Sequence, residues 1–231
     1  IPAAWCGVFG LKTTNGLLPS PDRTGLASPG VLTATAAEAL PYLRHVLGRR
    51  GKPPAVARLP VPAAYSPDLG FAEVDPAVAA VVRTAVDHLA CAEVVRLAPA
   101  GRFALLDPAE AWTAVRAGSP PPAMRALRAE NDALLDAFFA RTPLLLTPTT
   151  PNLPHGHDGP GDTYSTALTW AFNLSGHPAA SVPAGFGPDG CPVGLQLVAR
   201  RGADAELLAM ARAVESALPA FPRPLHTSTW W

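Results

Sequence analysis

The stretch Leu144-Leu145-Leu146-Thr147-Pro148-Thr149-Thr150-Pro151 decides the fold of this chain. Three consecutive leucines leave no polar face, and a short strand that is apolar on both sides is typical of a mixed sheet. The prolines that follow interrupt regular structure and end the apolar run. We therefore expect a strand with helices packed against each of its faces.

Amphipathic helices are predicted on both sides of this strand in the chain. Asp75-Pro76 supplies an N-cap and a proline at the first helical position, and apolar residues from Val78 to Leu89 then keep helical spacing. A capping-box pattern at Thr35 and Glu38 predicts a helix that runs to residue 47. Further helices are expected from residue 107 onward and over residues 123–140, 163–174 and 203–218. The 123–140 helix is expected to turn one side toward the core, formed by Leu127, Asn131, Leu134, Leu135 and Phe138.

Further strands are predicted over residues 55–59, 93–97, 180–183 and 193–198. A turn at Pro188-Asp189-Gly190 joins the last two as a hairpin. Residues 185–190 also have the spacing G-x-G-x-x-G, but a nucleotide-binding loop needs a helix after its glycines, and here a strand follows. Helices that alternate with short apolar strands predict an α/β fold: a mixed β-sheet covered by helices on both faces.

Charge and composition exclude several classes of protein. Lys plus Arg and Asp plus Glu both number 18, and the only basic cluster, Arg49-Arg50-Gly51-Lys52, fits a solvated turn. We therefore expect no nucleic acid and no anionic membrane as a partner.

Proline or charge interrupts every apolar run before the roughly 20 residues of a membrane span, so a soluble, cytoplasmic protein is expected. Residue 1 is not methionine and no secretion leader follows it, which favours a cut end.

Neither the cysteines nor the histidines form a pattern typical of a metal site. Cys6, Cys91 and Cys191 are few and widely separated, which predicts buried thiols in a reducing compartment. Cys6 is a poor candidate nucleophile because no histidine lies near it in the sequence. The segment His155-Gly156-His157-Asp158 offers three possible ligands, but a solvated loop is the better interpretation because the other histidines stand alone. We expect no metal and no cofactor.

Three ordered segments resemble the amidase signature family. Residues 1–13 read Ile-Pro-Ala-Ala-Trp-Cys-Gly-Val-Phe-Gly-Leu-Lys-Thr, like the part of the family's signature that follows its nucleophilic serine. Residues 144–151 are similar to a strand that ends in Thr-Pro-Thr beside the active site. Residues 173–198, with Asn-Leu-Ser-Gly-His-Pro-Ala at their start and Pro-Val-Gly-Leu-Gln near their end, are similar to the family's C-terminal run.

The resemblance implies an enzyme that hydrolyses a C–N amide bond through an acyl-enzyme. The family's serine nucleophile, cis-peptide serine and lysine would all lie before Ile1, together with the backbone N–H groups that hold the oxyanion. Residues 1–231 are then the C-terminal part of a single, incomplete domain without catalytic residues. Lys12 is not the family's catalytic lysine, and Thr13 replaces a proline of the signature, which should weaken the turn there.

The missing half of the domain is the expected partner, and the full enzyme could form a homodimer. Alone, the chain is expected to be inactive and to aggregate, because strands such as 144–146 would have bare edges. The alternative is a non-catalytic binding or assembly subunit that completes another chain's pocket. The upstream coding sequence discriminates between the two.

The same resemblance implies a small-molecule amide as substrate. Family members that act on glutaminyl substrates carry an acidic residue seven positions before Asn173, where this chain has Thr166. Tyr164, Thr166, Trp170 and Asn173 are the expected substrate-binding residues. Trp170, together with Tyr164 and Phe172, would make the pocket wall aromatic and largely apolar, which suits aryl or alkyl amides better than amino-acid amides. Trp170 and Phe172 fit ordinary core packing equally well.

Overall fold

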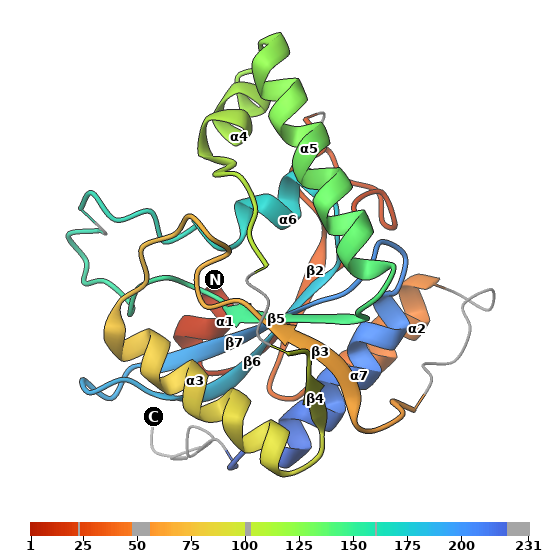
Figure 1. The fold of residues 1–231 in the computed structure, drawn as a ribbon, viewed down its shortest axis with the longest axis vertical. Coiled ribbons are helices and arrows are strands. Elements are labelled where there is room, and N and C mark those ends of the chain that lie inside the picture. The colour runs from red at the N-terminus through yellow and green to blue at the C-terminus, as the bar shows by residue number, and fades with distance from the viewer. Residues whose placement is uncertain (23, 48–55, 100–102, 160, 221–231) are drawn as a thin grey trace, which may run out of the picture.

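The computed structural model describes residues 1–22, 24–47, 56–99, 103–159 and 161–220. The basic cluster at 49–52 lies outside them. The described residues form seven strands: β1 (Phe9–Lys12), β2 (Gly30–Thr33), β3 (Val61–Tyr65), β4 (Val95–Leu97), β5 (Leu144–Pro148), β6 (Ala179–Phe186) and β7 (Pro192–Val198). They also form seven α-helices: α1 (Pro2–Cys6), α2 (Ala39–Leu47), α3 (Pro76–Cys91), α4 (Ala109–Arg116), α5 (Pro122–Phe139), α6 (Trp170–Ser175) and α7 (Asp204–Ala217). The strands make one sheet in the order β2-β1-β6-β7-β5-β3-β4 (Figure 1).

Strand β5 lies inside this sheet and makes it mixed. It pairs antiparallel with β7 and parallel with β3. All three leucines of β5 are fully buried: Leu144 and Leu146 belong to one apolar core and Leu145 to a second core on the opposite face. The predicted mixed sheet is therefore confirmed. The expectation of bare edges on β5 is wrong, because both of its neighbours belong to this chain; the edge strands of the described sheet are β2 and β4.

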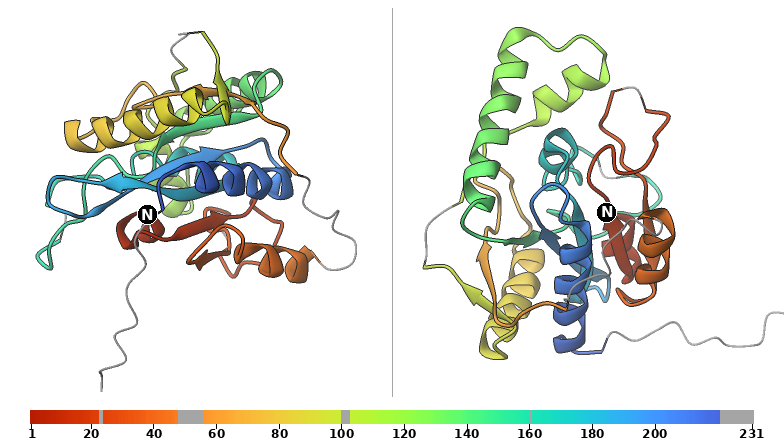
Figure 2. Two further views of the ribbon diagram at one scale, coloured as in Figure 1. Left: turned by 90° about the horizontal axis from the view of Figure 1, so that it is seen from below. Right: turned by 90° about the vertical axis from the view of Figure 1, so that its right-hand side faces the viewer.

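Helices cover both faces of the sheet, as predicted (Figure 2). Helices α2, α3 and α7 contribute to the core that contains Leu144 and Leu146. Helices α5 and α6 contribute to the core on the other face, around Leu145. Helices α4 and α5 form a hairpin that extends away from the sheet (Figure 1). None of the described helices combines the length and the apolar character needed to cross a membrane.

Several predicted elements are confirmed with their caps. The Asp75 carboxylate accepts a hydrogen bond from the Ala77 backbone N–H at 2.7 Å, where α3 begins. The Glu38 N–H donates to Thr35 Oγ1 at 3.3 Å. Residues 35–38 form turns, however, so that α2 begins only at Ala39. Strands β6 and β7 pair as the predicted antiparallel hairpin, and residues 187–191 connect them, while Gly185 and Phe186 still belong to β6.

Other elements lie elsewhere than predicted. The strand expected at 55–59 lies at 61–65, where Val61 and Ala63 supply the buried alternation; residue 55 is outside the described residues. Strand β4 starts at Val95, two residues later than expected. Within the predicted 163–174 helix only residues 170–174 are helical, after a series of turns, and α6 ends one residue later, at Ser175.

Helix α5 also faces the core differently from the prediction. It buries Asn131, Leu135 and Phe139, which are spaced by four residues. Leu134 instead lies on the outer side and is 39% exposed.

The prediction of buried thiols is wrong as well, because Cys6 and Cys91 are exposed and Cys191 is half-buried. Helix α1 packs through Ala3 and Ala4, which leaves Cys6 outside the contact.

Two glycines let α1 lie directly on the sheet. A Cβ atom on Gly10 of β1 would be 2.6 Å from Ala3 Cβ. A Cβ atom on Gly194 of β7 would be 2.6 Å from both Ala4 Cβ and Ser181 Oγ. Such distances are far below van der Waals contact, so any larger residue at either strand position would push the helix outward. This contact fixes residues 1–4 over the centre of the sheet.

We predict that Gly194→Ala destabilises the protein by about 1–3 kcal/mol, because the added methyl group cannot be accommodated without moving α1. Denaturant unfolding of wild type and variant measures the difference. Gly156→Ala is the matched control, since a Cβ atom there has no heavy atom within 4 Å. Equal stability of the Gly194 variant and the wild type would show that α1 is not packed as described.

Candidate functional site

The face of the sheet under α1 and α6 is polar at its centre. Along β1, Phe9 and Leu11 belong to the core on one side, so the alternating Gly10 and Lys12 face the other. Ser181 and Gln196 lie on this same polar face and are 7% and 3% exposed. Buried polar side chains are costly unless they are hydrogen-bonded, so their presence together in a sheet indicates a site.

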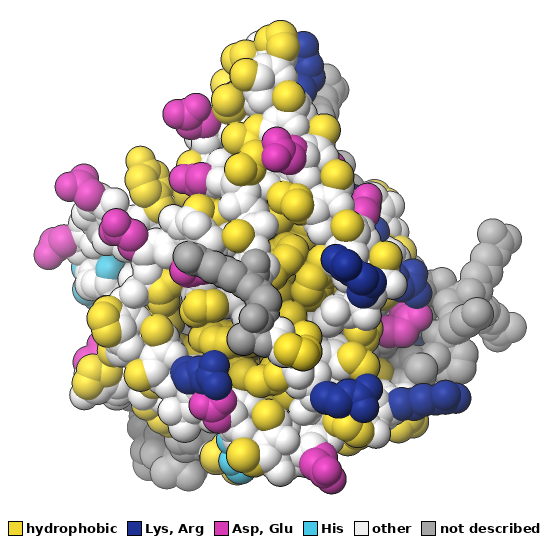
Figure 3. All heavy atoms as spheres, in the orientation of Figure 1, with side chains coloured by type: hydrophobic (Ala, Val, Ile, Leu, Met, Phe, Trp, Pro, Cys, Tyr) yellow, Lys and Arg dark blue, Asp and Glu magenta, His cyan; other side chains and the backbone are white. Residues whose placement is uncertain are grey.

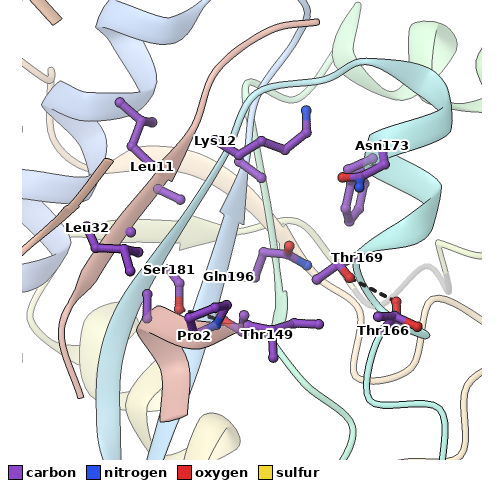
Figure 4. A pocket seen from close by; sticks show the side chains of 16 residues that line it. Pro2, Leu11, Lys12, Leu32, Thr149, Thr166, Thr169, Asn173, Ser181 and Gln196 are labelled. Carbon is purple, nitrogen blue, oxygen red and sulfur yellow. Dashed lines mark hydrogen bonds between the residues drawn. The ribbon is translucent and has the colours of Figure 1, made fainter. Parts of the chain in front are cut away.

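A pocket of about 310 Å³ opens over these residues. Its floor is formed by the strands, one side by the first residues of α1, and the facing wall by α6 and the turn before it (Figure 4). Its polar lining comprises Lys12, Thr149, Thr166, Thr169, Asn173, Ser181 and Gln196, and its larger apolar lining comprises Ile1, Leu11, Leu32 and Phe172. We call this the sheet pocket.

Hydrogen bonds hold the floor of the sheet pocket in place. The hydroxyl oxygens of Ser181 and Thr149 lie 2.8 Å apart. The Gln196 Nε2 donates to the Leu168 carbonyl at 3.0 Å, which ties β7 to the segment before α6. In Figure 4 the Gln196 amide points toward Thr169. The floor therefore presents oriented hydroxyl and amide groups to anything bound there.

The four residues predicted to bind substrate do not line one common pocket, because they lie on different sides of α6 and of the turn before it. Thr166 and Asn173 line the sheet pocket, as does Thr169 between them. Trp170 and Tyr164 instead line two other cavities on the far side of α6. There the Trp170 ring contacts Trp112 and Tyr164, each with ring centroids 5.7 Å apart. Phe172 combines both predicted roles, since it is buried in a core and also lines the sheet pocket.

Lys12 is a pocket residue that sequence reasoning missed. Its Nζ donates to the His177 carbonyl at 2.8 Å, to Asn15 Oδ1 at 3.0 Å and to the Thr13 carbonyl at 3.2 Å. Burial lowers the pKa of Lys12 to about 7, against the opposing effect of the Asp204 carboxylate. The alternation of Phe9-Gly10-Leu11-Lys12 was the available signal, because it places Lys12 on the face of Gly10.

Asn15 connects this lysine to the wall of the pocket. Its Nδ2 donates to the Asn173 carbonyl at 2.8 Å, and its Oδ1 also accepts from Ser28. Thr13 is fully buried, and its hydroxyl donates to the Pro29 carbonyl at 2.8 Å. The end of β1 and the C-terminal end of α6 are thus one connected unit.

His177 is buried beneath the site as a neutral imidazole. Its ring stacks on Phe139 with centroids 5.0 Å apart, and Nδ1 lies 2.8 Å from Ser175 Oγ. Burial, reinforced by the nearby positive charges of Arg201 and Lys12, lowers the pKa of His177 to about 3. Among the described residues no partner reaches its buried Nε2. His177 therefore acts in packing and does not carry charge at neutral pH.

The histidine-rich segment 155–158 lies in an exposed loop away from these residues, where the His155 ring contacts the Trp5 ring edge-on. No group of three or more His, Cys, Asp or Glu within the described ranges is placed to hold a metal ion. The polar groups that the sheet pocket offers to a ligand are its hydroxyls, its amides and Lys12. These groups can bind and orient a polar, uncharged group.

Comparison with known proteins identifies relatives that share this architecture. The Amidase family model matches residues 116–208. The chain is 27% identical to an acylamidase of Rhodococcus erythropolis over 95% of its own length and 59% of that protein. It is 44% identical to one component of the glutamyl-tRNA(Gln) amidotransferase of Neisseria gonorrhoeae over 33% of its length and 17% of that protein.

Solved structures show the same fold. A bacterial aryl acylamidase of the amidase signature family superposes with a TM-score of 0.74 at 20% identity, covering 94% of this chain and 59% of that one. The 6-aminohexanoate cyclic dimer hydrolase superposes with a TM-score of 0.65 at 25% identity, covering 95% and 62%. The chain thus spans about 60% of the length of the proteins it matches over nearly all of its own length.

We predict that His177 makes stability depend on pH. Its pKa is about 3 in the folded chain against an ordinary value of 6.5, so between these limits the unfolded chain binds more protons. Stability should therefore fall with pH from 6.5 to 3, by up to about 1.4 kcal/mol per pH unit, and His177→Phe should lack this contribution. Urea unfolding of both proteins at pH 7 and pH 4.5 measures it. Parallel pH profiles would contradict a buried neutral imidazole.

Proposed function

Because this chain belongs to the amidase signature family, we propose that it forms the substrate-binding side of an enzyme that hydrolyses a carbon–nitrogen amide bond. One observation carries this proposal: the sheet pocket is bounded by Ile1, Pro2 and Ala3, which begin the signature-like run. In the family signature the nucleophilic serine precedes that run. A nucleophile at this position would stand at the mouth of the pocket.

The proposed chemistry is acyl transfer in two stages. The serine oxygen attacks the amide carbonyl carbon, the C–N bond breaks, and the amine leaves with a proton; water then hydrolyses the acyl-enzyme to the carboxylic acid. We propose that the segment preceding residue 1 supplies the serine, its relay and the lysine, and that residues 1–231 complete the same domain. The contribution of this chain is orientation, through Ser181, Gln196 and the α6 wall.

The lining of the sheet pocket favours a neutral acyl group. None of the described residues that line it is acidic, and Lys12 is the one charged side chain among them. An ammonium group bound there would lose its hydration shell without gaining a carboxylate partner, which is costly. Phe172 and Leu32 offer apolar contact. We therefore propose aryl or alkyl amides with uncharged acyl groups as substrates.

The activity is tested by trapping the acyl-enzyme. The intact protein is incubated with acetanilide and propionanilide, and aniline release is followed with and without hydroxylamine. An acyl-enzyme predicts acyl hydroxamate formed in competition with the free acid, because hydroxylamine and water attack the same ester. Aniline release without any hydroxamate would contradict the acyl-enzyme. Absence of any amide hydrolysis would favour a non-catalytic binding subunit.

A charge introduced at Thr166 should reverse the preference for neutral acyl groups. We predict that Thr166→Asp raises kcat/KM for glycine anilide relative to propionanilide by about tenfold or more, because the carboxylate would pair with the substrate ammonium. Thr166→Asn is the matched control, with the same shape and no charge. If Asp and Asn at position 166 gave the same ratio of the two substrates, Thr166 would not face the acyl group.

A further inference from the structure

Gln196 presents a buried acceptor to the sheet pocket. The residue is only 3% exposed, and its side chain lines the pocket. Its Nε2 donates to the Leu168 carbonyl at 3.0 Å, which fixes the orientation of the amide. In Figure 4 its oxygen, Oε1, points into the space between Lys12 and Thr169. None of the described residues donates a hydrogen bond to this oxygen. Buried polar atoms are nearly always paired, so Oε1 indicates a donor that a ligand supplies.

Two donors that line the same pocket are already committed to other acceptors. The Lys12 ammonium has three N–H groups, and they donate to three oxygens at 2.8, 3.0 and 3.2 Å, so none is left for Gln196. The Thr169 hydroxyl donates to the Thr166 carbonyl at 2.9 Å. A hydroxyl oxygen that donates its proton can still accept a hydrogen bond. Gln196 Oε1 and Thr169 Oγ1 are therefore two acceptors on one side of the pocket.

The other end of the pocket floor carries a hydroxyl group beside α1. Ser181 lies directly opposite Gln196 in the register of β6 and β7, so their Cβ atoms are about 5 Å apart. A Cβ atom on Gly194 would be 2.6 Å from both Ser181 Oγ and Ala4 Cβ, which places this hydroxyl next to α1. The Gln196 amide instead reaches the segment before α6. The pocket thus has one end at α1, where the proposed nucleophile would stand, and an acceptor end at α6.

A neutral N–H donor fits these two acceptors better than a charged group. An ammonium ion would share the pocket with the Lys12 ammonium, and none of the described lining residues is acidic. A carboxylate has no N–H to donate. Acidic and basic residues are equal in number, and on the face shown in Figure 3 both signs are spread over several elements, so long-range attraction does not favour an ion. A primary carboxamide is uncharged and offers two N–H groups.

We propose that Gln196 and Thr169 form a subsite for a carboxamide at the far end of the acyl group. The substrates are then diamides of short dicarboxylic acids, which bind through one amide at this subsite and are cleaved at the other. The identity of the cleaved bond rests on the proposed function, whereas the subsite is a property of the sheet pocket alone. Gln196 is accordingly a specificity-determining residue, because it distinguishes acyl groups by a hydrogen-bond donor and not by size.

An activity test compares two anilides of the same shape. N-phenylbutanediamide ends in a carboxamide, and 4-oxo-N-phenylpentanamide has a methyl group in place of the NH2. The intact protein should release aniline from the diamide with a kcat/KM at least about tenfold higher, because the ketone leaves both acceptors unpaired. Thr169→Val should reduce this ratio by about threefold or more. Thr84→Val is the matched control, since Thr84 also donates to a backbone carbonyl but lies on α3 outside the pocket.

A binding test separates the subsite from catalysis. Succinamate and levulinate, the acids derived from these two anilides, carry the same charge and differ only in NH2 against CH3. Calorimetric titration of the intact protein at pH 7 should give a dissociation constant at least about fivefold lower for succinamate. Gln196→Met, which removes Oε1, should bind the two acids equally. Thr169→Val should reduce the preference for succinamate and replaces the Gln196 variant if that variant does not fold.

The subsite and the proposed hydrolysis fail in different ways. A preference for succinamate without any aniline release would support the subsite and contradict amide hydrolysis. Aniline release at equal rates from both anilides, with equal affinity for both acids, would overturn the subsite and leave the hydrolysis standing. Binding of neither acid, or an unchanged preference in both site variants, would also overturn the subsite.

Discussion

Burial of the three leucines of β5 is the constraint on which the rest of the structure depends. Each is fully buried, yet they face opposite ways: Leu144 and Leu146 into one core, Leu145 into the other. Burying each side chain contributes roughly 2 kcal/mol, and neither face can be left to water. The chain must therefore supply a helical layer on each side, and both layers are built from segments distant in sequence.

The same alternation places the polar groups of the sheet pocket. Thr147 and Thr149 follow Leu145 at two-residue spacing and lie on the same face of the sheet. Along this face the side chains therefore change from apolar at Leu145 to hydroxyl-bearing at the two threonines. A slip of one residue in β5 would bury threonine among leucines and expose leucine to the pocket. Gly10 and Gly194 then allow α1 to close over this face. The register of β5 therefore determines both the packing of the core and the geometry of the sheet pocket.

Sequence reasoning succeeded where a periodic pattern spans several turns or a whole strand. The 16 residues of α3 carry a proline-marked start and a continuous buried face, and both were predictable. Helix α6 has only 6 residues, too few to reveal which side faces which cavity. The resemblance located Tyr164, Thr166, Trp170 and Asn173 near one helix, but only the structure shows that this helix divides them. The prediction placed β3 too early in the chain because Pro60 and Pro62 obscure the alternation of buried and exposed residues at its start.

The segment that ends in α6 lies between the sheet pocket and the cavities that Trp170 lines, and we propose that only the sheet pocket binds the acyl group. The most direct test is a crystal structure of the intact protein soaked with propionate, the acid that the proposed hydrolysis of propionanilide would release. We expect density for propionate in the sheet pocket, within hydrogen-bond distance of Ser181, Gln196 or Asn173, and none beside Trp170. Density for propionate beside Trp170, with the sheet pocket empty, would contradict this proposal.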